Sequence, residues 1–117
     1  MSVKLNDRAF DHAKSLIKEG KYVLDERDDW SEHQPSAREE NEFIEKHGWS
    51  EYALWHLGVD TDMDEDTKGR YKFPYGDFKK AHRCGLLAAE TRAAQRDYHD
   101  IASAAHQLHE MIDELQE

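Results

Sequence analysis

The sequence has few cysteines and prolines and lacks a long apolar segment. Cys84 is the only cysteine, and the 117 residues include 2 prolines. A single cysteine excludes an internal disulfide and a zinc knuckle built from several cysteines. No apolar run approaches the roughly 18 to 20 residues that span a bilayer, and the first residues lack the apolar stretch of a secretory signal. These absences predict one cytoplasmic domain over residues 1–117, with no membrane association.

Sequence signatures of catalysis are also missing. The chain contains no glycine-rich phosphate loop, no Gly-x-Ser-x-Gly elbow and no kinase signature. Cys84 follows His82 by two residues, and residues two apart on a helix point to different sides, so they cannot form a nucleophile and base within one helix. We therefore expect a buried, unreactive Cys84, no catalytic residue and no cofactor.

Charge is unevenly distributed along the chain. Asp and Glu number 26 against 16 Lys and Arg, which gives a net charge of −10. By segment, the net charge is +2 over residues 1–24, −12 over 25–66, +5 over 67–83 and −5 over 84–117. The total argues against non-specific binding to nucleic acid. The segregation predicts an acidic surface and a basic one on the same molecule.

The spacing of apolar residues predicts a mainly helical chain. Ser36 and Glu39 have the spacing of a capping box, in which each side chain bonds the other residue's backbone amide at the start of a helix. Asp77 is a candidate cap for a later helix. The last two helices are rich in alanine, so we expect them to pack closely as an antiparallel hairpin. The expected helices cover residues 7–19, 36–47, 78–96 and about 97–115, with a short helical turn over 50–55.

A small β element is expected in the middle of the chain. Residues 55–59 and 71–73 alternate apolar and polar side chains, as the two strands of a ribbon do. Residues 60–69 are polar and long enough for the hairpin loop between them, while 21–24 form a short extended piece and 25–35 a loop. The predicted fold class is mainly α, with about four helices and a small two-stranded β element; an α+β fold is the alternative.

Eight histidines make metal binding an alternative function. His106 and His109 lie three residues apart on the last predicted helix, and His82 is close to Cys84. No His-Glu-x-x-His pattern accompanies them, and His82 falls on a predicted inner face, where histidine is more often a hydrogen-bonded core residue. A histidine-rich metal-binding protein or metalloenzyme, with His82, His106 and His109 as candidate ligands, stays open.

Basic and aromatic residues alternate over residues 68–83, a composition that suits gripping phosphates while stacking bases. On a strand, however, the aromatic side chains would take the face opposite to the basic ones and point into the core. A plainer alternative is that the basic face compensates the acidic segment of the same molecule. Binding of nucleic acid or another polyanion is thus an alternative and not the expected function; its candidate residues are Arg70, Lys72, Lys79, Lys80 and Arg83.

Three segments carry a resemblance to known proteins: Trp-His-Leu-Gly-Val-Asp at 55–60, Lys-Phe-Pro-Tyr-Gly-Asp-Phe at 72–78 and His-Arg-Cys-Gly at 82–85. Together they resemble a group of short bacterial proteins of unknown function. The part that runs from the proline into the helix hairpin is similar to a small helical module of phage-associated proteins. The resemblance covers about residues 50–115 and implies a compact helix hairpin with a short extended lead-in. It implies no activity, cofactor or catalytic residue.

The function we expect is that of a small acidic interaction or accessory protein without catalysis. The segment 25–66 would recognise a basic protein partner, because opposite charges attract and steer association. A second copy of the chain is another candidate partner, and mimicry of DNA by the acidic segment is a further hypothesis. The residues expected to bind the partner are Asp28, Asp29, Glu40, Asp62 and Asp64.

Overall fold

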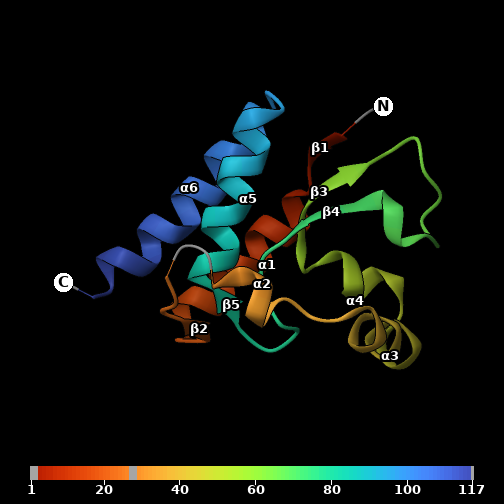
Figure 1. Ribbon diagram of the computed structural model, residues 1–117, viewed down its shortest axis with the longest axis horizontal. Helices are drawn as coiled ribbons and strands as arrows, with labels where there is room; N and C mark the ends of the chain where they lie inside the picture. Colours follow the sequence, from red (N-terminus) through yellow and green to blue (C-terminus); the bar gives the residue numbers. More distant parts are fainter. Residues whose placement is uncertain (1–2, 27–28, 117) are drawn as a thin grey trace.

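The computed structural model describes residues 3–26 and 29–116. Over these residues it has six α-helices, a three-stranded antiparallel sheet and a two-stranded parallel pair (Figure 1). This is an α+β mixture with a large helical share, which agrees in outline with the expected class but has more helices and strands. The elements are β1 (Val3–Leu5), α1 (Asp7–Lys18), β2 (Tyr22–Val23), α2 (Trp30–His33), α3 (Ala37–His47), α4 (Trp49–Ala53), β3 (His56–Asp60), the 3-10 turn η1 (Lys68–Arg70), β4 (Tyr71–Pro74), β5 (Ala81–His82), α5 (Arg83–Gln95) and α6 (His99–Glu114).

Helices with clear local signals form where the sequence places them. The capping box of α3 is present: the Glu39 amide donates to the Ser36 hydroxyl and the Ser36 amide to the Glu39 carboxylate, each at 3.1 Å. α3 buries none of its side chains, as its few apolar residues predict. α1 and α6 also lie close to the predicted ranges. Capping and apolar spacing depend on residues a few positions apart, so these helices can be predicted without the tertiary structure.

The helix expected over residues 78–96 starts later, at Arg83. Asp77 turns the chain instead of capping a helix, because its Oδ1 accepts hydrogen bonds from the amides of Lys79 at 3.0 Å and Lys80 at 2.8 Å. Phe78 then adopts a φ of 69°, outside the helical region. The strand β5 follows and pairs in parallel with β2, with Tyr22 opposite Ala81 and Val23 opposite His82. A local turn and a distant strand therefore replace the first turns of the predicted helix.

Two further elements of the structure, β1 and α2, were not predicted from the sequence. β1 pairs antiparallel with β3, with Lys4 opposite Val59, and extends the predicted ribbon to a sheet of order β1-β3-β4. α2 lies inside the segment 25–35 that was expected to be a loop, and its Trp30 is only 4 % exposed. Both elements are too short to show a period, so packing against the rest of the chain defines them.

The α5–α6 hairpin packs against the sheet, and α1 contacts both (Figure 1). α3 and α4 lie away from the hairpin, next to the other end of the sheet. No helix in the described part of the chain is long and apolar enough to cross a membrane. Alanines at the helix contacts let the backbones approach closely. The core includes Ala9, Ala13 and Ile17 of α1, Leu57 of β3, Ala89 and Ala93 of α5, and Ile101, Ala105, Leu108 and Ile112 of α6.

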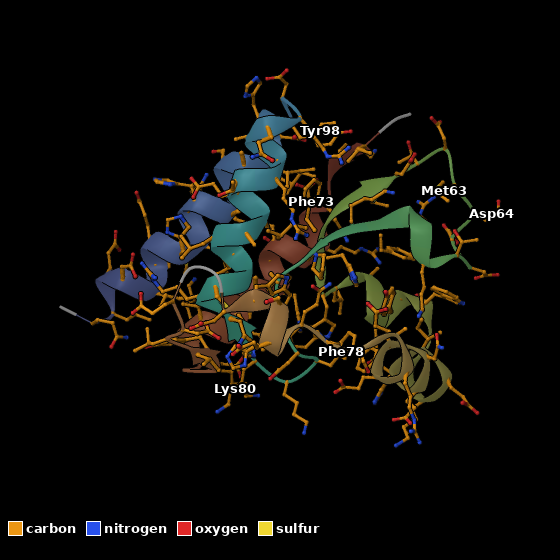
Figure 2. The ribbon with its side chains drawn as sticks, in the orientation of Figure 1. Met63, Asp64, Phe73, Phe78, Lys80 and Tyr98 are labelled. Atoms are coloured by element: carbon orange, nitrogen blue, oxygen red, sulfur yellow. The ribbon has the colours of Figure 1, made fainter. Side chains whose placement is uncertain are left out.

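A sharp bend after β4 sends neighbouring aromatic residues to different parts of the molecule. Phe73 has a φ of 61°, like Phe78 in the left-handed region that is costly for a side chain with a Cβ. Phe73 meets the ring of Tyr98 edge to face at 6.0 Å, whereas Phe78 stacks on Phe43 of α3 at 4.3 Å (Figure 2). A Cβ at Gly76 would lie 2.6 Å from an indole atom and 2.7 Å from a backbone carbonyl, so glycine permits the bend.

Candidate functional site

Two of the three candidate histidines meet on the α5–α6 hairpin. Glu90 of α5 accepts a hydrogen bond from His106 Nδ1 on Oε2 and one from His109 Nε2 on Oε1, each at 2.8 Å. The two imidazole rings lie 4.9 Å apart at an angle of 81°. One ligand atom of each residue lies within 4.8 Å of the others. We call Glu90, His106 and His109 the Glu90 cluster.

The electrostatics of the Glu90 cluster favour an ionised carboxylate. Burial by itself would raise the pKa of Glu90, but the hydrogen bonds from His109 and His106 lower it below its usual value. The bond to Glu90 raises the pKa of His106, and the nearby charge of Glu110 adds to this effect. Glu110 Oε1 lies 2.5 Å from His106 Nε2, so the imidazole is held between two carboxylates.

The two histidines differ in their access to solvent. The His106 side chain is 49 % exposed, while His109 is 8 % exposed as a whole residue. His109 Nδ1 is buried and has no hydrogen-bond partner among the described residues. The Glu90 cluster is therefore open on the His106 side and closed by the protein interior on the His109 side.

His82, the third candidate, lies at the other end of α5 in a separate buried network. Its Nδ1 is 2.7 Å from Oδ2 of Asp25, and its Nε2 is 2.9 Å from Oδ2 of Asp77. Burial would raise the pKa values of both carboxyl groups, but hydrogen bonds lower them: from Cys84 and His82 to Asp25, and from His82 and Lys80 to Asp77. Each ring nitrogen thus faces a carboxylate oxygen, which accepts but does not donate hydrogen bonds when ionised. We call these three residues the His82 triad.

Asp25, His82 and Cys84 also place ligand atoms within 4.8 Å of one another, yet these atoms already have partners. Asp25 Oδ1 accepts from the Cys84 amide at 2.9 Å, and Oδ2 accepts from His82. Burial and the hydrogen bond to Asp25 raise the pKa of the Cys84 thiol, whereas a ligand or nucleophile needs the thiolate. Cys84 is 1 % exposed, as expected for a core cysteine. The His82 triad thus joins the segment before α2 to the start of α5.

The acidic residues expected to bind a partner are spread over several elements. Asp28 lies outside the described residues, and Asp29 directly precedes α2. Asp62 and Asp64 are exposed in the loop between β3 and η1. Nothing in this arrangement identifies a partner, so the acidic recognition surface stays a prediction.

Glu40, the remaining acidic candidate, is engaged inside the molecule. Its carboxylate accepts hydrogen bonds from the Tyr52 hydroxyl at 3.2 Å and from the Lys68 ammonium group at 3.3 Å. Lys68 also donates to the Ala37 carbonyl at 3.3 Å. This contact ties the hairpin loop to α3 and pairs one residue of the basic segment with one of the acidic segment.

The candidate residues for polyanion binding are dispersed by the bend. Arg70 donates to a backbone carbonyl of the hairpin loop at 2.7 Å, and Arg83 pairs with an α6 carboxylate at 2.8 Å. Lys79 and Lys80 are exposed at the turn before β5, and Figure 2 shows Lys80 far from Met63 and Asp64 of the hairpin loop. Lys72 lines a pocket between β4 and α5. The five residues belong to several separate environments, and binding of a polyanion through them stays a prediction.

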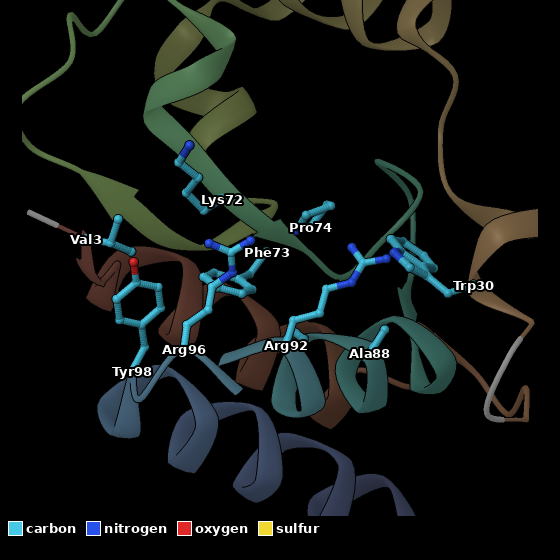
Figure 3. A pocket seen from close by; sticks show the side chains of 10 residues that line it. Val3, Trp30, Lys72, Phe73, Pro74, Ala88, Arg92, Arg96 and Tyr98 are labelled. Carbon is cyan, nitrogen blue, oxygen red and sulfur yellow. The ribbon is translucent and has the colours of Figure 1, made fainter. Parts of the chain in front are cut away.

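That pocket has a volume of about 230 Å³ and is missing from the sequence-based expectation (Figure 3). Arg92 in the last turn of α5 and Arg96 at its C-cap are four residues apart, a spacing that indicates one helix face, but the sequence does not show what lies opposite them. No aspartate or glutamate lines the pocket in the described part of the chain. Its cationic and aromatic lining consists of Lys72, Arg92, Arg96, Trp30, Phe73 and Tyr98.

Comparisons with protein-family models, with curated proteins and with solved structures found no match to this chain. The resemblance of residues 50–115 to short bacterial and phage-associated proteins therefore stays a prediction. Functional proposals consequently rest on the geometry of the side chains.

Proposed function

We propose that this protein binds a divalent transition-metal ion at the Glu90 cluster. One observation carries the proposal: a single carboxylate is held between two imidazole nitrogens at 2.8 Å each. Ligand atoms about 2.1 Å from an ion lie about 3.0 Å apart at a right angle and about 3.4 Å apart at a tetrahedral angle. Each N–O distance is thus within a few tenths of an ångström of these values, and all the ligand atoms lie within 4.8 Å of one another, so an ion would draw the two imidazoles closer together. Two imidazoles and a carboxylate suit ions such as Zn²⁺, Co²⁺ or Fe²⁺.

The surroundings of His106 support the same proposal. With Nδ1 on the ion, Nε2 would donate to Glu110, four residues further along α6. Histidine ligands usually donate their other ring nitrogen to a carboxylate or carbonyl, which orients the ring. The exposure of His106 leaves space for water to complete the coordination shell. Such an open site suits reversible binding or substrate access better than a closed structural site.

The competing interpretation is that the Glu90 cluster only clamps α5 to α6 through hydrogen bonds. Such a clamp would stabilise the fold without metal, and adding metal would not raise the free energy of unfolding. A metal site that exists in the folded chain alone adds about 2.7 kcal/mol to the free energy of unfolding when the free ion is at about 100 times its Kd. Thermal unfolding with and without Zn²⁺ distinguishes a metal site, which raises the unfolding temperature when Zn²⁺ is added, from a clamp, which does not.

Replacing His106 with glutamine should weaken binding of Zn²⁺ and Co²⁺ by about tenfold or more, because one of three protein ligands is lost. Isothermal titration calorimetry on untagged protein measures the affinity. The matched control is His47→Gln: His47 pairs with Glu51 at 3.1 Å on a helical surface without a second histidine. The control should bind within about twofold of the original protein. Unsaturable binding, or an equal loss in both variants, would contradict the proposal.

A second proposal concerns the acidic surface and is favoured by the exposure of α3. This helix buries no side chain, and Glu39, Glu42 and Glu45 are exposed along it. Phe43 attaches the helix to the body by stacking on Phe78. Glu42 and Glu45 therefore remain available to a basic protein partner, whose association they would steer electrostatically, whereas the Glu39 carboxylate caps the start of the helix.

Lysine substitutions at Glu42 and Glu45 should reduce the affinity of such a partner by about tenfold, since like charges then face each other, while Glu39 stays in place to cap α3. The partner is first captured from a native source, and its Kd for each variant is then measured at about 0.15 M salt. A control with the same charge change is a variant with lysine at the exposed positions Asp11 and Glu114. Equal affinity for the α3 variant and the control would remove this proposal.

A further inference from the structure

The pocket between β4 and α5 gathers positive charge in a protein whose net charge is −10. Arg92 lies in the last turn of α5, Arg96 is the C-cap residue of that helix, and Lys72 comes from β4. Within the described residues, none of these three cations forms an ion pair, in contrast to Lys68 and Arg83, which do. Like charges one turn apart on a helix repel each other. A bound anion would relieve that repulsion.

Aromatic rings form the other part of the lining. Phe73 and Tyr98 meet edge to face at 82°, and Trp30 lies at the opposite end of the pocket. In the view of Figure 3 the guanidinium group of Arg96 is drawn beside Phe73, and that of Arg92 is directed toward Trp30. The ammonium group of Lys72 extends away from α5 in this view, so the two arginines are the principal anion-binding groups.

The ring of Phe73 is held against the pocket at a cost. Its left-handed φ of 61° is unfavourable for a phenylalanine. A Cβ at Gly58 of β3 would lie 2.8 Å from the Phe73 ring, so the absence of a side chain there makes room for it. Backbone strain of this kind concentrates at ligand-binding sites, where surrounding structure fixes an otherwise rare conformation.

These features select the chemistry of the ligand. Arginine presents a planar fork of donors that matches a phosphate group, and two arginines with a lysine nearby suit a dianion better than a single negative charge. Aromatic faces beside the cations suit a flat ring. The volume of about 230 Å³ is below the roughly 300 to 1,000 Å³ of typical ligand pockets, so the compound is small. We propose that this pocket binds a small phosphate monoester that carries a flat ring.

The pocket is independent of the Glu90 cluster. Glu90 and Arg92 are two residues apart on α5, and residues with that spacing point to different sides of a helix. Glu90 faces α6 through its bonds to His106 and His109, whereas Arg92 faces the pocket. The His106→Gln variant should therefore bind a phosphate monoester as the original protein does, and the two proposals can fail separately.

Phenyl phosphate is the probe for the test, with inorganic phosphate and benzoate as comparison ligands. Calorimetry at about 0.15 M salt should show saturable binding of phenyl phosphate that is about tenfold tighter than that of either comparison ligand. The double variant Arg92→Gln/Arg96→Gln should lose about tenfold in affinity or more. Lys79→Gln/Lys80→Gln removes the same charge at an exposed turn outside the pocket and should stay within about twofold.

Several outcomes would overturn the proposal. They are the absence of saturable binding of phenyl phosphate, equal losses in the two double variants, and affinity for inorganic phosphate or benzoate equal to that for phenyl phosphate. Tighter binding of a single-stranded oligonucleotide that depends equally on Lys79 and Lys80 would also overturn it. In the original protein, phenyl phosphate should shift the indole N–H resonance of Trp30, a readout that does not depend on a variant folding.

Discussion

Replacing Asp25 with alanine is expected to lower the free energy of unfolding by about 3 to 5 kcal/mol, the cost of removing one partner from a buried charged network. Asp25 is 8 % and His82 is 4 % exposed, and their atoms lie 2.7 Å apart. Alanine would leave the His82 imidazole with the Asp77 carboxylate alone and deprive the Cys84 amide of its acceptor. Urea unfolding monitored by circular dichroism measures the effect.

Two further variants make the Asp25 result specific. Asparagine at position 25 should cost about 1 to 2 kcal/mol, because its side chain keeps an oxygen for the Cys84 amide but replaces the oxygen facing His82 with an NH2 group, which cannot accept a hydrogen bond. Asp29→Ala removes a carboxylate that accepts from the Glu26 amide at 3.0 Å near the surface, and it should cost about 1 kcal/mol or less. If alanine at position 25 were as mild as Asp29→Ala, the His82 triad would not be a stabilising network.

Acidification from about pH 7 to about pH 4 should remove about 3 kcal/mol of stability through His56 alone. His56 is 2 % exposed, and burial lowers its pKa from 6.5 to about 4. Each pH unit between the two values corresponds to about 1.4 kcal/mol. The unfolded chain takes up a proton near pH 6.5 while the folded chain resists it, so stability begins to fall there and stops falling below about pH 4.

His56→Asn tests this assignment. His56 Nδ1 donates to the Tyr52 carbonyl at 3.0 Å, and the asparagine amide can donate from a similar position without titrating. The difference in unfolding free energy between the two proteins should therefore shrink by about 3 kcal/mol as the pH falls. The pKa values of Asp25, Asp77 and Glu90 are lowered in the folded protein. The stability that these carboxylates contribute is therefore lost as the pH falls through their folded-state pKa values. A parallel pH dependence of the two proteins would contradict the assignment.

The sequence predicted only part of the candidate metal site, namely its two histidines and not Glu90. The three-residue spacing of His106 and His109 indicates one face of a helix, and the structure places both rings there. Glu90 joins them because α5 returns alongside α6, an arrangement that depends on packing of the alanine-rich hairpin. His82 was an equal candidate for a metal ligand in the sequence, but both of its ring nitrogens contact carboxylates, those of Asp25 and Asp77.

The pocket shows the opposite relation between sequence and structure. Arg92 and Arg96 stand in a stretch without any recognised motif, and Lys72 belongs to a segment whose aromatic residues were expected to turn inward together. The bend after β4 instead sends Phe73 to the pocket and Phe78 to α3. Two left-handed residues and the close approach at Gly76 produce this bend, and their energetic cost is offset by contacts that no local pattern reveals.

The sequence by itself determined the helices whose ends carry caps or whose faces repeat every three to four residues, such as α3 and α6, and it determined the segregation of charge. Those features arise from interactions within one or two turns. Only the tertiary structure decided that Asp77 begins a turn, that β1 completes the sheet, and which charged residues meet at the Glu90 cluster, the His82 triad and the pocket. These arrangements depend on burial and on pairing between segments far apart in the chain. The energy of each such contact depends on partners that cannot be identified from the neighbouring sequence.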